Sequence, residues 1–159
     1  MGLEQFLSIV KSNVLSNGHG FAPAPPMIDG FPVENQRMLV QKWWKNHWVH
    51  QWFFDNVDDT CNEGDDVMVS HKELAELADK LEAWADDPEA LPPISDEIRG
   101  PFFGVHPDDE EYEAVRDEYR GAAKEEAKKI RQAVEWLKVD DDRPLRDREY
   151  RYAVYKVCA

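Results

Sequence analysis

The chain has 159 residues, of which 42% are hydrophobic and 33% charged, and its formal net charge is −14. This length and apolar content suffice for one folded domain with a single core, which excludes a disordered chain. The negative charge disfavours direct binding to nucleic acid and to anionic membrane surfaces, because both carry charge of the same sign.

The first predicted element is a β-strand at residues 2–10, GLEQFLSIV, which is apolar and ends in the β-branched pair Ile9 and Val10. The next segment, residues 12–32, is rich in Gly and Pro, and both residue types interrupt helices and strands. We therefore expect a long loop at 12–32, within a single domain that spans residues 1–159.

The densest aromatic stretch of the chain follows, KWWKNHWVHQWFF at residues 42–54. No Gly or Pro interrupts residues 35–56, and apolar side chains recur on nearly every side of a helical wheel. A helix with this pattern is buried on nearly all sides. We predict a central helix over 35–56 with Trp44, Trp48 and Trp52 excluded from water, since a core position explains these residues better than a stacking platform for a ligand.

An acidic loop at 55–66 and a short strand at 66–69 precede a second predicted helix. Ser70 and Glu73 have the spacing of a capping box, which places the start of this helix directly after Ser70, and Pro88 ends it. Residues 91–105 are irregular, with FFGV at 102–105 as a candidate edge strand.

A third, long helix is predicted from about residue 108 to residue 138. The terminal segment REYRYAVYKV, residues 148–157, alternates in polarity and is rich in Tyr and Val, as strands are. Both terminal segments have strand composition, and the helices between them need a sheet or each other to cover their apolar faces, so we predict that 2–10 pairs with 148–157. The predicted fold class is α+β, with three main helices packed against a small antiparallel sheet formed by the N- and C-terminal strands.

Several of these segments form a recognisable combination. In chain order they are MGLEQFL, WWKNHWVHQWFFDNV, VSHKELAEL, GPFFG followed by an acidic helix, and the Tyr-rich terminal strand. This combination resembles an uncharacterised family of small phage and prophage proteins. The resemblance implies a phage origin and an α+β fold, and it implies no reaction.

Carboxylates are concentrated in two clusters, one in the acidic loop and one where the third helix is predicted to start. The clusters are Asp55, Asp58, Asp59, Glu63, Asp65 and Asp66, and Asp108, Asp109, Glu110, Glu111 and Glu113. A soluble domain needs a net charge of only ~2–8. We therefore predict that the excess charge binds a basic host or defence protein, including the case in which the surface mimics nucleic acid. A role in solubility alone is the alternative that the composition leaves open.

A second hypothesis is a small enzyme or ligand-binding protein. Its pocket would lie where His47 and His50, which share a helical face, meet the turn at 100–104 with Phe103 and Gly104. No GxSxG, HExxH or phosphate-binding glycine loop is present in the sequence, so we assign no catalytic residue. A zinc site would need further ligands at no recognised spacing, such as Cys61, so we predict no metal and no cofactor.

The cysteines and the N-terminal residues bear on the compartment. Cys61 and Cys158 form neither a CxxC pair nor a disulfide framework, which favours a reducing environment. The N-terminal residues lack the pattern of a signal peptide, and no stretch approaches the ~20 apolar residues of a membrane span. We expect a cytoplasmic protein without membrane contact, located in an infected bacterial host if the phage resemblance holds.

Overall fold

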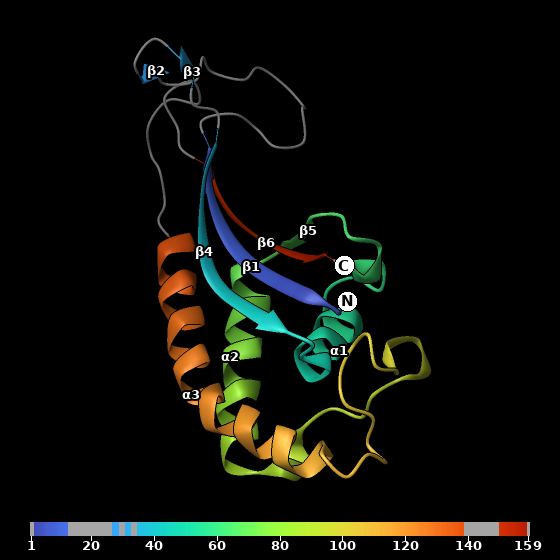
Figure 1. Cartoon of the computed structure of the whole chain (residues 1–159). Helices are drawn as coiled ribbons and strands as arrows, with labels where there is room; N and C mark the ends of the chain where they lie inside the picture. The colour runs from blue at the N-terminus through green and yellow to red at the C-terminus, as the bar shows by residue number, and fades with distance from the viewer. Residues whose placement is uncertain (1, 13–26, 29–30, 33–34, 139–149, 159) are drawn as a thin grey trace.

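The computed structural model describes residues 2–12, 27–28, 31–32, 35–138 and 150–158. These residues form an α+β fold in which a four-stranded sheet is covered by helices on one face (Figure 1). The strands of this sheet are β1 (Glu4–Ser12), β4 (Asn35–Trp44), β5 (Val67–Val69) and β6 (Tyr150–Cys158), and the helices are α1 (His47–Asn56), α2 (His71–Asp86) and α3 (Tyr112–Leu137).

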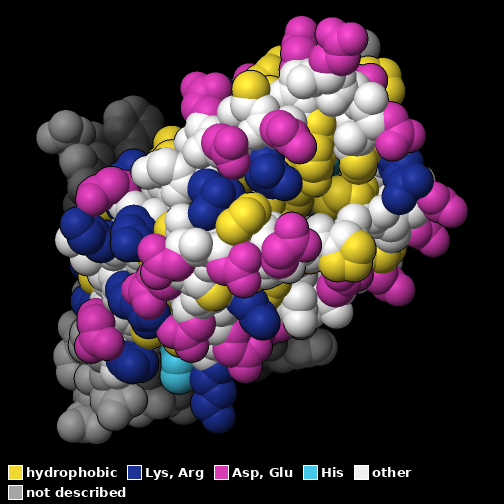
Figure 2. Space-filling view, turned by 90° about the horizontal axis from the view of Figure 1, so that it is seen from below, with side chains coloured by type: hydrophobic (Ala, Val, Ile, Leu, Met, Phe, Trp, Pro, Cys, Tyr) yellow, Lys and Arg dark blue, Asp and Glu magenta, His cyan; other side chains and the backbone are white. Residues whose placement is uncertain are grey.

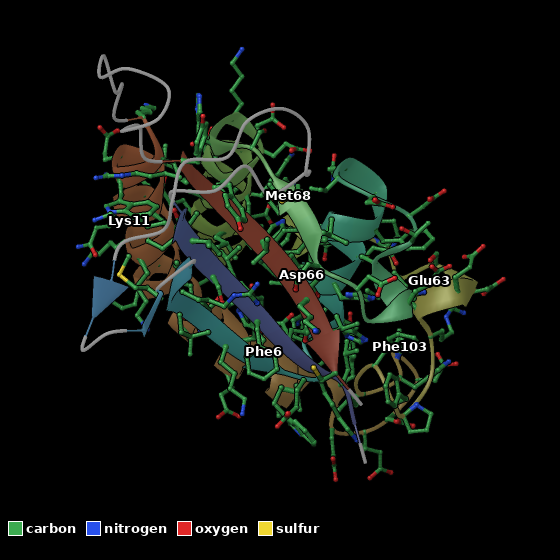
Figure 3. The ribbon with its side chains drawn as sticks, turned by 90° about the horizontal axis from the view of Figure 1, so that it is seen from above. Phe6, Lys11, Glu63, Asp66, Met68 and Phe103 are labelled. Carbon is green, nitrogen blue, oxygen red and sulfur yellow. The ribbon has the colours of Figure 1, made fainter. Side chains whose placement is uncertain are left out.

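The sheet is antiparallel, with strand order β4-β1-β6-β5, which can be followed in Figure 3. Strand β1 pairs with β6 along its whole length, from Glu4 opposite Cys158 to Ser12 opposite Tyr150. The predicted pairing of the N- and C-terminal strands is therefore confirmed. Strand β1 is central because its neighbours cover both of its edges, and Leu7 and Val10 are almost completely buried.

Helices α2 and α3 lie side by side, run in opposite directions and cover one face of the sheet (Figure 1). Apolar residues three and four positions apart give each helix one buried stripe: Leu74, Leu77, Ala78, Leu81 and Trp84 on α2, and Ala123, Ala127, Ile130, Ala133 and Val134 on α3. The capping box of α2 is present, since Ser70 Oγ accepts from Glu73 N at 3.1 Å and Glu73 Oε1 accepts from Ser70 N at 2.9 Å. The predicted start of this helix is therefore correct.

The predicted helix over 35–56 is wrong in its first half, where the chain forms strand β4. Strand β4 pairs antiparallel with β1, and a one-residue bulge between Leu7 and Ser8 accommodates the register. Lys45 then adopts a left-handed backbone conformation with φ of 49°, and Asn46 caps α1 by accepting from Val49 N at 3.2 Å. Backbone pairing with β1 outweighs the helical pattern of the segment, because otherwise that edge of β1 would remain unpaired.

This correction changes the positions of the tryptophans. Trp48 and Trp52 on α1 are 2% and 4% exposed, as predicted, and Trp43 is also buried. Trp44 is 57% exposed, so its predicted exclusion from water is wrong. In a strand, neighbouring side chains point to opposite faces, so Trp43 and Trp44 cannot both enter the core.

Three other predicted segments differ from the structure or fall partly outside it. Helix α3 begins at Tyr112 instead of about residue 108, and 102–105 is a turn in which Gly104 N donates to Gly100 O at 3.2 Å. The predicted loop at 12–32 lies largely outside the described residues. In the part of it that is described, β2 (Met27–Ile28) pairs with β3 (Phe31–Pro32). No helix in the described part of the chain is both long and apolar enough to cross a membrane.

Candidate functional site

The structure brings together the four residues of the predicted His50 pocket. The His50 ring stacks on Phe103 with 5.8 Å between ring centres, and a Cβ on Gly104 would lie 2.8 Å from His47 Nδ1. However, both histidines are at most 2% exposed and Gly104 is buried. The helix face and the turn therefore meet in a packed contact, at the end of the sheet where Figure 3 shows Phe103.

His50 belongs to a buried hydrogen-bond network. Tyr155 accepts from Gln5 Nε2 at 3.1 Å, so its hydroxyl proton is free to reach His50 Nδ1 at 2.7 Å. Nδ1 then accepts, so the single N–H proton of the neutral ring lies on Nε2, which donates to Asn62 Oδ1. Burial lowers the pKa of His50, against the opposing effect of the Asn62 contact. Both ring nitrogens are therefore satisfied internally, and the neutral imidazole links α1 to β6.

Cys61 and His50 are neighbours without the electrostatics of a catalytic pair. Cys61 Sγ lies 3.9 Å from His50 Nε2 and is 1% exposed. Burial, and then the negative charge of Asp58, raise the pKa of the thiol to about 12. A nucleophilic cysteine needs a lowered pKa, so this thiol is a core residue. Among the described residues, no group of three or more His, Cys, Asp or Glu side chains is arranged to hold a metal ion.

In the acidic loop, several carboxylates stabilise local structure. Asp55 accepts from Gln51 Nε2 at 2.9 Å, Asp58 accepts from Thr60 N at 2.8 Å, and Asp66 forms an ion pair with Arg37 at 2.9 Å. The Thr60 hydroxyl also donates to Asp58, and this bond, followed by the bond from Thr60 N, lowers the pKa of Asp58. Asp55, Asp58 and Asp66 therefore stabilise the loop itself. The other three carboxylates of the cluster, Asp59, Glu63 and Asp65, are exposed and have no side-chain partner among the described residues.

The second cluster, which we call the 108–113 segment, consists of Asp108, Asp109, Glu110, Glu111 and Glu113, all exposed. It forms the turns that precede α3 and the first turn of that helix. The one basic side chain of the described chain within ion-pair distance of these carboxylates is His106, whose Nδ1 lies 3.6 Å from Asp108 Oδ2. The same nitrogen accepts from Asp108 N at 3.1 Å, so in this arrangement it has no proton to donate to the carboxylate.

A hollow that the sequence did not reveal lies between α3, the end of β4 and the start of α1, and its volume is about 430 Å³. We call it the Glu126 hollow, after the buried carboxyl group in its wall. Its wall consists of Lys42, Trp43, Trp44, Lys45, Asn46, Trp48, Val115, Glu118, Tyr119, Ala122 and Glu126. Trp48 stacks on Tyr119 with 5.6 Å between ring centres, while Trp44 is the wall residue that is both aromatic and exposed.

Three polar side chains in this wall are more than nine-tenths buried: Asn46, Tyr119 and Glu126. Glu126 is 7% exposed and accepts from Trp43 Nε1 at 2.8 Å. Burial raises the pKa of Glu126 to about 7, against the opposing effects of the Trp43 hydrogen bond and the charge of Lys129. The buried Tyr119 hydroxyl lies near Asn46 and Glu126 without a hydrogen bond of good geometry to either, and burial, followed by the charge of Glu126, raises its pKa well above 10.

Glu126 has one signal in the sequence. It lies three residues after Ala123 and four before Ile130, so a charged residue occupies a position of the apolar stripe of α3. The partner that it meets, Trp43, comes from the segment that the sequence predicted as a helix. Family models, curated proteins and solved structures give no match to this chain.

Proposed function

We propose that the protein is a non-enzymatic binding protein whose 108–113 segment engages a basic surface on a partner protein. The observation that carries this proposal is a difference in ion pairing between helices α2 and α3 and the 108–113 segment. On α2 and α3, Arg131 pairs with Asp79 at 2.7 Å and with Glu82 at 2.8 Å, and Lys124 pairs with Asp86 at 3.1 Å. The carboxylates of the 108–113 segment form no ion pair with a Lys or Arg of the described structure, and Arg116, one turn further along α3, pairs with Asp117 instead.

Exposed like charges that lie this close together repel one another, and a positively charged surface removes that repulsion. Figure 2 shows Asp and Glu side chains spread over one face of the molecule with Lys and Arg between them. Overall charge alone therefore does not distinguish one part of that face from another. The 108–113 segment differs because five carboxylates fall within six consecutive positions. Complementary charge accelerates association and selects partners more than it adds affinity.

The place to search for the partner follows from the resemblance to small phage and prophage proteins. A phage-encoded protein of this kind would act in the cytoplasm of its bacterial host, on a host or defence protein. A partner that normally binds nucleic acid is favoured, because its binding surface already carries the positive charge that carboxylates attract.

The experiment compares two variants of equal net charge. The neutralised variant carries Asp109→Asn, Glu110→Gln and Glu111→Gln, and the control variant carries three substitutions at exposed positions elsewhere: Glu76→Gln, Glu89→Gln and Glu97→Gln. Native protein and both variants are immobilised and exposed to bacterial lysate at low salt.

We expect the native protein and the control variant to retain the same basic protein, and the neutralised variant to lose it. Raising the salt to about 500 mM should release it from the native protein, because exposed charges are then strongly screened. Equal retention by both variants, or no basic protein on the native chain, would refute the proposal.

A further inference from the structure

The Glu126 hollow combines a buried carboxyl group with an exposed aromatic ring, Trp44. Glu126 accepts from Trp43 Nε1 at 2.8 Å, and the buried Tyr119 hydroxyl lies beside it. A carboxylate can accept several hydrogen bonds, so Glu126 has acceptor capacity left for a ligand in the hollow. The exposed face of Trp44 offers a second contact to the same ligand.

We infer that this hollow binds an organic cation, the ammonium or guanidinium group of a lysine or arginine side chain. This inference rests on the proposed function, because a basic partner protein would supply such a side chain. The hollow would provide a binding site for one basic side chain of the partner, next to the 108–113 segment, which selects partners by charge alone. The 108–113 segment ends two residues before Val115, the first wall residue on α3, so both features can contact one partner.

The composition of the wall favours a cation over an anion. Carboxylates of Glu118 and Glu126 line the hollow, and aromatic rings attract cations to their faces. The protein's own Lys45 already places its Nζ 5.9 Å from the centre of the Trp44 ring. The other lysine of the wall, Lys42, forms an ion pair with Glu4 at 3.2 Å. The guanidinium of arginine suits a carboxylate beside a tryptophan, since it donates two parallel hydrogen bonds and stacks on aromatic rings.

Ligand binding should be coupled to release of a proton from Glu126. Lys129, Trp43 and Tyr119 act directly on its carboxyl group, and the other charged residues of the wall are Glu118 and the two lysines. Its pKa is raised to about 7, so near neutral pH the carboxyl group is partly protonated. A bound cation favours the ionised form, so affinity should increase between about pH 6 and pH 8.

The test uses the Trp43 indole N–H, which donates to Glu126 and therefore reports on it directly by NMR. The probes are N-acetyl-arginine amide, its lysine counterpart, and N-acetyl-citrulline amide, which has nearly the shape of the arginine probe without its charge. The variants are Glu126→Gln and, as a matched control, Glu125→Gln, which removes an exposed carboxylate on the same helix that pairs with Lys128 at 2.8 Å.

We expect the arginine probe to shift the Trp43 signal saturably in the native protein and in Glu125→Gln, and to bind at least about tenfold more weakly to Glu126→Gln. The citrulline probe should bind at least about tenfold more weakly to the native protein. Equal effects of the arginine and citrulline probes, no saturable shift with arginine, or undiminished binding to Glu126→Gln would each overturn the inference.

A further arm identifies the source of the cation. A short peptide with one arginine flanked by alanines should bind more tightly than the single-residue probe if the ligand is a protein side chain. Tighter binding of free methylguanidinium than of the peptide would assign the hollow to a small-molecule cation and overturn the assignment to a side chain. The neutralised variant should still bind the arginine probe, so failure of the hollow and failure of the 108–113 segment are distinguishable.

Discussion

Replacing Glu126 with glutamine should stabilise the protein increasingly as pH rises. Burial raises the pKa of Glu126 from 4.5 to about 7, whereas unfolding returns the group to water. The folded state therefore holds the proton more tightly than the unfolded state does. The resulting destabilisation is nearly absent below pH 4.5, grows between pH 4.5 and about 7, and is constant above that range. At about 1.4 kcal/mol per pKa unit, the full penalty is about 3 kcal/mol.

Glutamine keeps an acceptor for the Trp43 indole and carries no charge. Relative to the native protein, Glu126→Gln should therefore gain about 2 kcal/mol in free energy of unfolding when the pH is raised from about 5.5 to about 8.5. The lower pH stays above the isoelectric point of about 4.7, near which the protein is least soluble. Other titrating groups, such as His47 with its pKa lowered by burial to about 4, are common to both proteins and cancel in the difference.

The assay is guanidinium-induced unfolding followed by tryptophan fluorescence at both pH values. Glu125→Gln is the control, because its carboxylate is exposed and the hydrogen bond from Lys128 lowers its pKa. Its stability relative to the native protein should change little across this pH range. If the stability difference between Glu126→Gln and the native protein is the same at both pH values, Glu126 is not a buried ionisable group and the electrostatic description of the hollow is wrong.

Three other predictions concern packing. Trp48→Ala should cost ~3–5 kcal/mol in free energy of unfolding, because Trp48 is buried. Trp44→Ala should cost less than ~1 kcal/mol, because Trp44 is 57% exposed. Similar costs for the two substitutions would contradict the strand assignment of β4. Gly104→Ala should destabilise the protein by ~1–3 kcal/mol, because the new Cβ would lie 2.8 Å from a buried histidine nitrogen. Gly121→Ala should stabilise it by ~0.5–1 kcal/mol, because a Cβ there would meet nothing and alanine favours the helix. Chemical denaturation measures both changes. The Cys61 thiol should react with Ellman's reagent only as denaturant unfolds the protein, and rapid reaction in native buffer would show that it is accessible.

The parts of the fold that were predicted correctly have strong local signals. Tyr and Val alternate with polar residues in the terminal strand, and the capping box marks the start of α2. The pairing of β1 with β6 followed from the need to cover the apolar faces of the helices, which is a constraint on the whole domain. Local patterns and this global constraint agree in these segments, so the sequence was sufficient there.

The aromatic stretch was misassigned because its apolar residues are so dense that they fit a helix and a strand equally well. The deciding interaction is the pairing of β4 with β1, which joins residues from 23 positions apart (Ser12 with Asn35) to 40 positions apart (Glu4 with Trp44) and leaves no periodic trace. A local signal was available in Asn46, a favoured N-cap residue, and it marks the true start of α1.

The Glu126 hollow was missed for the same reason. Its buried carboxyl group contacts Trp43, 83 residues away in the sequence, and that contact exists only because β4 is a strand that ends beside α3. Conversely, the predicted meeting of His50 with Phe103 was correct in position. The sequence did not show that the histidine nitrogens would be satisfied by Tyr155 and Asn62, because tertiary partners determine whether such a cluster is a pocket or a packed core.

The most direct test of the proposed function is the salt dependence of affinity for the recovered basic partner. Titrations of this partner onto the native protein, the neutralised variant and the control variant are compared from about 50 to about 500 mM salt. We expect the native protein and the control variant to lose affinity steeply and equally as salt rises. The neutralised variant should bind at least about tenfold more weakly at low salt, with a shallower dependence. If the two variants, which have the same net charge, bind the partner equally at every salt concentration, the 108–113 segment is not the binding surface.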